Sequence, residues 1–211
     1  MKQSERTDLT RTRIREAFIN LVESKGFGNL TVSDLTREAS VSRGTFYVHY
    51  ADKHELLASI EHDLRANITK IIKDDIAATI EVHSINDASS TSPNEELSDN
   101  LYNLFNHALY YIDQKRHTMK VLMSPNGDPQ FFDEIKNVID DTFAQQLQSG
   151  NGYFSDTLPI DYTKEIVVNN VVYLVRHWIN KTHPESTEDF AKILMQSRFL
   201  APNDLIIFSK A

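Results

Sequence analysis

The stretch from 31 to 53, TVSDLTREASVSRGTFYVHYADK, constrains the fold most, because it predicts two short helices joined by a tight turn. Thr31 is a good N-cap residue, and Asp34 can reach back to the free amides at the start of the helix, as in a capping box. Ser42 offers a second N-cap for a helix from Arg43 to about His49. Two helices at this spacing are the pattern of a helix-turn-helix.

The second of these helices carries unusual groups on the side that should face solvent. Phe46 and Tyr50 are four residues apart, so we expect them to point inward together. Gly44 would allow another molecule to approach the backbone closely. The outward side chains are donors and flat rings, which contact phosphates, base edges and thymine methyl groups in DNA. They are Arg43, Thr45, Tyr47 and His49.

An ordinary solvated helix with two half-exposed aromatic side chains is the alternative interpretation of this segment. The two N-caps, the spacing of the helices and their position near the N-terminus all disfavour it.

The segment from about Thr10 to Leu57 resembles the DNA-binding domain of the TetR family of transcriptional regulators. In that family a helix precedes the helix-turn-helix, and a fourth helix opens with the motif aromatic-x-x-Lys-x-x-Leu. This chain has YADKHEL at 50–56, preceded by VSRGTFY at 41–47. Tyr50 stands where many members have phenylalanine, which is a small departure.

The resemblance implies a role for individual residues in DNA binding. Tyr47 and His49 would touch the DNA backbone, and Lys53 would contact a phosphate at the start of its helix. Arg43 and Thr45 would lie nearest the base edges. The full set of residues that we expect at the DNA is Thr31, Ser42, Arg43, Gly44, Thr45, Tyr47, His49 and Lys53.

Charge is distributed unevenly along the chain. The 211 residues carry a formal net charge of −8, which by itself argues against binding to nucleic acid. Residues 1–53, however, hold nine basic and seven acidic side chains, whereas the remainder holds 13 basic and 23 acidic ones. The basic excess therefore lies in the segment that carries the helix-turn-helix, and an acidic body would be repelled from DNA.

Composition excludes several classes of protein. Hydrophobic residues make up 40% and charged residues 25%, as in ordinary soluble domains. The absence of cysteine excludes disulfides, thiolate metal sites and cysteine nucleophiles. No apolar run of about 18 residues predicts a membrane helix, and the N-terminus is too polar for a signal peptide, so we expect a cytoplasmic protein that does not bind membranes.

Enzyme motifs are missing as well. There is no Gly-rich phosphate loop and no nucleophile motif, and His54-Glu55 lacks the second histidine of a zinc-protease site because position 58 is Ala. We therefore expect no catalytic residue, no metal site and no cofactor.

The helices group into two expected domains. A helix over 9–25, stopped by Gly26, completes the DNA-binding domain at 1–53. Arginines near its start can contact phosphates, with a solvated helix end as the alternative for at least half of them; they are Arg6, Arg11, Arg13 and Arg15. A long helix from 54 to about 85 leads into the second domain, 54–211, after which 86–96 is a polar loop. Further helices are expected over 97–112, 114–123, from Asp128-Pro129 to about 148, 162–181 and 187–200.

The helix over 162–181 is apolar around most of its circumference, so it should be buried on two sides. With the last helix it is the natural contact between two subunits, although burial within one subunit remains an alternative. The expected dimer residues are Val168, Val171, Val172, Val175, Phe190, Ile193, Leu194 and Ser197.

The run KVLMSPNGDPQF at 120–131 resembles a C-terminal domain found in the TetR-like subset that includes the dihydroxyacetone kinase operon regulators. Some members of this subset act with a partner protein in place of a small-molecule inducer. Aromatic and thioether side chains nevertheless also suit a cavity for a hydrophobic or aromatic ligand, with plain core packing as the alternative. The candidate ligand-binding residues are Tyr102, Phe105, His107, Tyr111, Met123, Phe132, Tyr173 and His177.

These observations predict an all-α protein, with a three-helix DNA-binding domain followed by a larger helical domain for ligand binding and dimerisation. The expected function is that of a transcriptional regulator that binds a palindromic operator in double-stranded DNA. We expect it to bind as a homodimer, because a single three-helix DNA-binding domain makes too few contacts for selectivity. We expect a repressor released by a small-molecule inducer. The alternatives are a regulator whose second domain binds a partner protein and, less favoured by the motifs, an enzyme.

Overall fold

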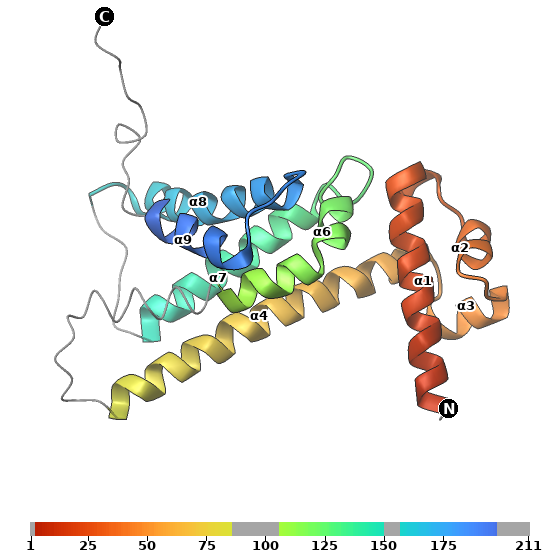
Figure 1. The fold of residues 1–211 in the computed structure, drawn as a ribbon, viewed down its shortest axis with the longest axis horizontal. Coiled ribbons are helices and arrows are strands. Elements are labelled where there is room, and N and C mark those ends of the chain that lie inside the picture. The colour runs from red at the N-terminus through yellow and green to blue at the C-terminus, as the bar shows by residue number, and fades with distance from the viewer. Residues whose placement is uncertain (1–2, 86–105, 150–156, 198–211) are drawn as a thin grey trace, which may run out of the picture. The chain divides into compact units, whose positions relative to one another are not determined.

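The computed structural model describes residues 3–85, 106–149 and 157–197, and all regular structure in them is helical (Figure 1). The all-α prediction is therefore confirmed. The elements are α1 (Gln3–Lys25), the 3₁₀ turn η1 (Phe27–Asn29), α2 (Val32–Glu38), α3 (Arg43–His49), α4 (Lys53–Ile85), α6 (Arg116–Leu122), α7 (Phe131–Ser149), α8 (Ile160–Asn180) and α9 (Thr187–Ser197). Residues 106–114 are also helical, and the expected loop at 86–96 lies outside the described residues.

The chain divides into two compact units. Unit 1 comprises residues 1–67 and 115–135, and unit 2 comprises 68–114 and 136–211. The predicted DNA-binding domain, 1–53, lies entirely within unit 1. Unit 1 also includes the first half of α4, together with α6 and the start of α7. The domain boundary after residue 53 stays a prediction.

Helix α1 supplies much of the core of unit 1 through one apolar face. Ile14, Phe18 and Val22 are completely buried, and Ala17 and Leu21 are nearly so, as their spacing predicts. The helix begins at Gln3, six residues before the predicted start. The prediction missed this part because residues 5–8 are polar and exposed. Apolar periodicity detects only the part of a helix that packs against a core.

The loop between α6 and α7 is held against the C-terminal end of α1. The amide of Phe27 donates to the carbonyl of Asn126 at 2.8 Å, and the side-chain amide of Asn126 donates to the carbonyl of Glu23 at 3.1 Å. Gly127 has no room for a side chain, since a Cβ atom there would lie 2.2 Å from the carbonyl oxygen of Leu122. These contacts explain why a segment more than 100 residues from α1 belongs to the same unit.

Two predicted helix boundaries in this region are wrong. Helix α7 begins at Phe131 instead of at Asp128-Pro129, because the carboxylate of Asp128 accepts from the amide of Gln130 at 2.8 Å and holds a turn before the helix. Helix α6 is also shorter than the predicted segment 114–123.

In unit 2, helices α8 and α9 pack through one aromatic pair. The rings of Trp178 and Phe190 are stacked, with centroids 4.7 Å apart and planes 6° apart. The indole nitrogen of Trp178 donates to the carbonyl of Glu185 at 3.0 Å, so this buried donor is satisfied. Burial on two sides, predicted for α8, is not seen among the described residues, where four of its large apolar side chains are exposed, namely Ile160, Tyr162, Ile166 and Tyr173.

No helix in the described part of the chain combines the length and apolar character needed to span a membrane.

Candidate nucleic-acid interface

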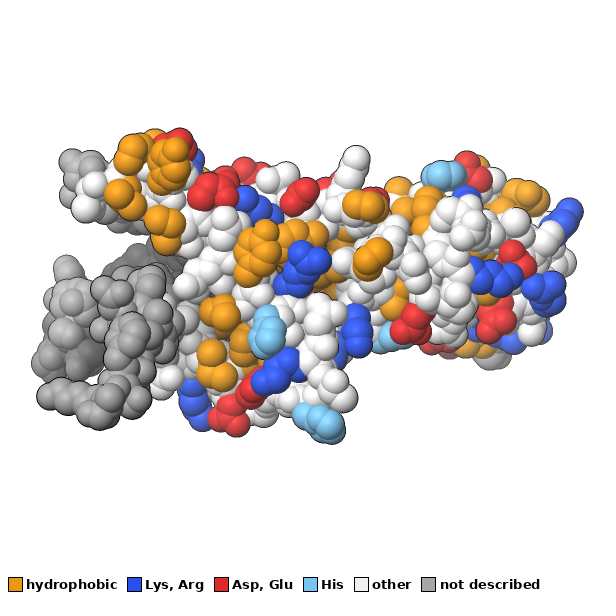
Figure 2. Space-filling model, turned by 90° about the horizontal axis from the view of Figure 1, so that it is seen from above, with side chains coloured by type: hydrophobic (Ala, Val, Ile, Leu, Met, Phe, Trp, Pro, Cys, Tyr) orange, Lys and Arg blue, Asp and Glu red, His pale blue; other side chains and the backbone are white. Residues whose placement is uncertain are grey.

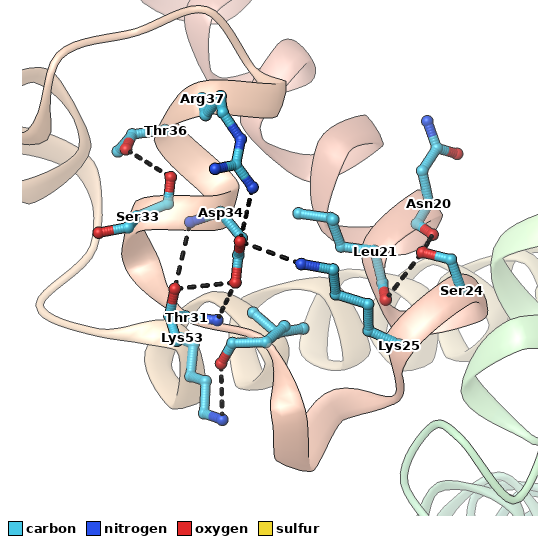
Figure 3. A network of polar contacts seen from close by, with 11 residues as sticks. Asn20, Leu21, Ser24, Lys25, Thr31, Ser33, Asp34, Thr36, Arg37 and Lys53 are labelled. Atoms are coloured by element: carbon cyan, nitrogen blue, oxygen red, sulfur yellow. Dashed lines mark hydrogen bonds and ion pairs between the residues drawn. The ribbon is translucent and has the colours of Figure 1, made fainter.

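The start of α2 is fixed by the predicted capping box, which the structure confirms. The hydroxyl of Thr31 accepts from the amide of Asp34 at 3.2 Å, and the carboxylate of Asp34 accepts from the amide of Thr31 at 3.1 Å. Lys25 and Arg37 also donate to this carboxylate, at 3.1 Å and 2.8 Å (Figure 3). The ammonium of Lys25, followed by the bonds from Thr31, lowers the pKa of Asp34 to about 2.

The turn between α2 and α3 is also held by contacts between residues close together in the sequence. Ser40 adopts a positive φ of 53°, and the amide of Val41 donates to the carbonyl of Thr36 at 3.0 Å, which closes the C-terminal end of α2. The hydroxyl of Ser42 then accepts from the amide of Thr45 at 3.0 Å and caps α3, as predicted. A guanidinium nitrogen of Arg43 donates to the hydroxyl of Ser33, which links the first turns of the two helices.

Helix α3 separates its side chains in the predicted way. Phe46 is completely buried and Tyr50 is 4% exposed, so both point inward. On the other side, Arg43, Gly44 and Tyr47 are exposed, and Thr45 and His49 are half-buried. The structure therefore brings five of the eight predicted DNA-binding residues onto one helix. Thr31 and Ser42 are exposed at the starts of α2 and α3.

Lys53 is the predicted residue whose environment differs most from the expectation. Its ammonium donates to the carbonyls of Phe27, Gly28 and Leu30, at 2.9, 3.1 and 3.0 Å. It also lies 4.8 Å from the centre of the Phe27 ring. An ammonium has three donors, and all three are engaged here. This geometry lets Lys53 hold the turn before α2 to the start of α4, and the phosphate contact of Lys53 stays a prediction.

Arg15 is likewise engaged within the protein. Its guanidinium donates to the hydroxyl of Tyr50 at 3.2 Å and to that of Ser59 at 2.7 Å, and it forms an ion pair with Asp63 at 2.6 Å. Arg15 therefore joins α1, the end of α3 and α4, in place of the phosphate contact considered for it. Arg6, Arg11 and Arg13 are exposed on α1.

A second polar cluster on α4 was not foreseen from the sequence. The carboxyl of Glu61 is 6% exposed, and its Oε1 atom lacks a hydrogen-bond partner. Burial raises the pKa of Glu61 to about 7, and the nearby carboxylates of Asp128 and Glu134 add to this effect. Arg65 opposes it and also pairs with Glu134. A hydrogen bond between Glu61 and Asp128 forms when one of the two is protonated.

The predicted ligand-binding residues that the structure describes are divided between the two units. Tyr102 and Phe105 lie outside the described residues. Met123 and Phe132 belong to unit 1 and are half-buried, whereas His107, Tyr111, Tyr173 and His177 belong to unit 2, where only Tyr111 is half-buried and the others are exposed. A ligand cavity stays a prediction.

The predicted dimer residues divide by burial. Val168, Val172, Phe190 and Leu194 are already buried within the single chain, with at most 3% exposed, so they form the α8–α9 core. Val171, Val175 and Ser197 are half-buried, and Ile193 is 39% exposed. The apolar pattern of α8 does not say which of its faces packs inside the subunit.

The described residues contain no group of three or more histidine or acidic side chains placed to hold a metal ion.

Comparison with known families matches both parts of the chain. Residues 14–60 match the family described as bacterial regulatory proteins, tetR family, and residues 99–198 match the one described as transcriptional regulator C-terminal region. Together these matches include the capped helix-turn-helix and helices α6 to α9. The chain belongs to the TetR family of transcriptional regulators.

Curated relatives resemble this TetR family regulator over short segments. An uncharacterised helix-turn-helix-type regulator of Bacillus subtilis, YxbF, is 42% identical over 52 residues, which cover 24% of this chain and 14% of the relative. A regulator of Staphylococcus aureus, SAB2452, is 35% identical over 78 residues, which cover 36% of this chain and 42% of the relative. The matches therefore span less than half of the length of these relatives.

Solved structures share the fold along most of the chain. A TetR transcriptional regulator from Streptococcus agalactiae has a TM-score of 0.59 at 20% identity, covering 92% of this chain and 96% of that one. NalD of Pseudomonas aeruginosa, the secondary repressor of a multidrug efflux pump, has a TM-score of 0.58 at 17% identity, with the same coverage of 92% and 96%. FadR of Bacillus subtilis, solved with stearoyl-CoA, has 0.57 at 15% identity, covering 88% and 95%. The subset of dihydroxyacetone kinase operon regulators is not confirmed by these comparisons.

Proposed function

We propose that this TetR family regulator represses transcription by binding a palindromic operator with the exposed face of α3. The observation that carries the proposal is the composition of that face, where donors and an exposed tyrosine surround a glycine on a helix capped and anchored by its neighbours. Such a helix fits the major groove of DNA. The protein would act in the cytoplasm, where the DNA lies.

The proposed dimer uses the exposed apolar side of α8 together with α9. Tyr162, Ile166 and Tyr173 are 63%, 59% and 55% exposed and recur at helical spacing, and Ile193 of α9 is 39% exposed. In Figure 2, several exposed hydrophobic side chains are visible between charged ones in this view of the molecule. Exposed apolar side chains that form a patch mark protein contacts. A second subunit would place two reading heads on two half-sites.

The proposed signal is a small hydrophobic or aromatic molecule bound among the helices of the second domain. The fold is shared with FadR, which was solved with stearoyl-CoA, and this makes acyl-type ligands a reasonable first class to test. A ligand that binds the free dimer better than the operator-bound one lowers operator affinity by the same factor.

DNA binding is tested by selection from random duplexes, followed by measurement of the affinity of Tyr47→Ala for the selected site. We expect a palindromic site and a large loss of affinity in this variant. Tyr110→Ala is the matched control, since Tyr110 is 61% exposed, compared with 56% for Tyr47, but belongs to unit 2. Failure to recover any palindrome, or equal losses in both variants, would contradict the proposal.

Dimerisation is tested by sedimentation of Ile166→Asp, which should shift the protein to monomers. Leu9→Asp is the control, because Leu9 is a similarly exposed apolar residue, at 52%, on α1.

If acyl-CoA and aromatic ligands leave operator affinity unchanged while a purified partner protein changes it, a partner protein replaces the small molecule.

A further inference from the structure

Val48 is the most exposed of the large hydrophobic side chains in the described part of the chain. It is 81% exposed, compared with 56% for its neighbour Tyr47. Single hydrophobic residues on a surface are common and need no explanation by themselves. The position of Val48 on α3, however, distinguishes it from the others.

Helix geometry places Val48 at the centre of the outward face of α3. Successive residues of a helix are separated by about 100°. Val48 follows the buried Phe46 by two positions and precedes the buried Tyr50 by two, so it lies about 160° from each of them around the helix, opposite the midpoint between them. Gly44, one turn earlier on the same side, has only the hydroxyl of Ser42 within 4 Å of a hypothetical Cβ.

The neighbours of Val48 are polar. Arg43 and Tyr47 lie on one side of it along the helix surface, and Thr45 and His49 lie on the other. The exposed face of α3 therefore has an apolar centre, made of the Gly44 backbone and the two methyl groups of Val48, between two rows of hydrogen-bonding groups. The polar rows can bind phosphates and base heteroatoms, which a valine side chain cannot do.

The apolar group that DNA presents in the major groove is the C5-methyl of thymine. We propose that Val48 is a specificity-determining residue, which selects a thymine in each operator half-site by apolar contact with this methyl group. The inference rests on the proposed function, because it requires α3 to enter the major groove. It adds a residue and a base preference that the aromatic-x-x-Lys-x-x-Leu motif does not contain.

The expected effect follows from the area of one methyl group. Burial of one methylene-sized group contributes about 0.8 kcal/mol, which corresponds to roughly fourfold in affinity. A palindrome contains two such contacts, so we expect roughly tenfold or slightly more when both are lost.

The experiment replaces thymines of the selected operator, one position per half-site at a time, by deoxyuridine, which lacks only the C5-methyl group. Affinity is measured for the unchanged protein, for Val48→Ala and for the control Leu9→Ala, with thermal unfolding to verify that each variant is folded. We expect one symmetric pair of deoxyuridines to weaken the unchanged protein and the control roughly tenfold and to leave Val48→Ala unaffected. Val48→Ala on the unmodified operator should bind as weakly as the unchanged protein on the deoxyuridine operator.

The possible failures are distinguishable. If no deoxyuridine position weakens the unchanged protein, or if the same position weakens Val48→Ala to the same extent, Val48 does not select thymine, although operator binding itself stands. If the selection returns no operator at all, the proposed function fails and this inference fails with it. A cytosine at the sensitive position should bind weakly, and 5-methylcytosine there should restore part of the affinity.

Discussion

The first half of α4 makes polar contacts with two parts of unit 1, and these contacts differ in charge balance. Toward residues 1–52, the cations Lys53 and Arg15 meet carbonyls, hydroxyls and the carboxylate of Asp63. Toward residues 124–135, the carboxyl of Glu61 meets the carboxylates of Asp128 and Glu134, with Arg65 as the opposing cation. In the first set each cation has a carbonyl, hydroxyl or carboxylate partner, whereas the second set places three carboxyl groups beside a single cation.

The difference indicates which contacts are constant and which depend on conditions. The carbonyls that accept from Lys53 are neutral groups, so these hydrogen bonds do not depend on the charge of the acceptor. A buried carboxyl beside other carboxylates changes its charge near neutral pH. We therefore expect α3 to be held rigidly, while the contact of α4 with the α6–α7 loop weakens as pH rises.

The largest expected effect comes from Lys53→Met, which removes the three hydrogen bonds of the ammonium and leaves the carbonyls of Phe27, Gly28 and Leu30 without that donor. We expect the free energy of unfolding to fall by about 2–4 kcal/mol in urea denaturation. Lys120→Met, at an exposed position on α6, is the control and should change it by less than about 0.5 kcal/mol. If Lys53→Met leaves stability unchanged but reduces the salt slope of DNA binding by about 1, Lys53 is a phosphate ligand after all.

Arg15→Met also tests the contacts between α4 and residues 1–52. The variant leaves Tyr50, Ser59 and Asp63 without their shared cation, and we expect a loss of about 2–3 kcal/mol in the free energy of unfolding. The loss should be equal at pH 5.5 and pH 8, because Arg15 stays charged throughout. Arg13→Met, on the exposed surface of the same helix, provides the comparison. A loss that changes strongly between the two pH values would contradict the distinction between the two sets of contacts.

Glu61→Gln tests the contacts between α4 and residues 124–135, where carboxyl groups lie close together. The pKa of Glu61 is raised to about 7 in the folded chain from an ordinary 4.5, so the folded state binds more protons between these values. The free energy of unfolding therefore falls as pH rises from about 4.5 to about 7, and the stabilising contribution is lost above that range. Because glutamine resembles the protonated carboxyl, we expect Glu61→Gln to stabilise the protein by about 1–2 kcal/mol at pH 8 and to have little effect at pH 4.5. Destabilisation at pH 8 would show that the charged carboxylate is the favoured form.

Glu134→Gln should have the smallest effect, since it removes one of the two like charges near Glu61 and also the partner of Arg65. We expect the pH midpoint of the stability change to move down by less than about one unit. Asp133→Asn, which changes an exposed neighbour on α7, should leave the midpoint in place. Equal shifts in both variants would indicate a general effect of net charge.

The sequence by itself determined the local features of the helix-turn-helix. The capping box of Thr31 and Asp34, the cap at Ser42 and the inward side of α3 all depend on groups within four residues of one another. Contacts at this range follow from helix geometry whatever the rest of the chain does, so residue types and spacing suffice to predict them. The motif at 50–56 likewise predicted where α4 begins.

Only the tertiary structure decided what each charged group meets. The acceptors of Lys53 lie 23 to 26 residues earlier in the chain, and the partner of Arg65 lies 69 residues later. The same limit applies to α8, whose apolar residues were visible in the sequence although the face that packs on α9 was not. A sequence pattern indicates which residues favour burial or ion pairing. The partner of each residue is selected when distant segments fold together. The strength of these contacts depends on the distance between the two groups, and the spacing of residues along the chain does not give that distance.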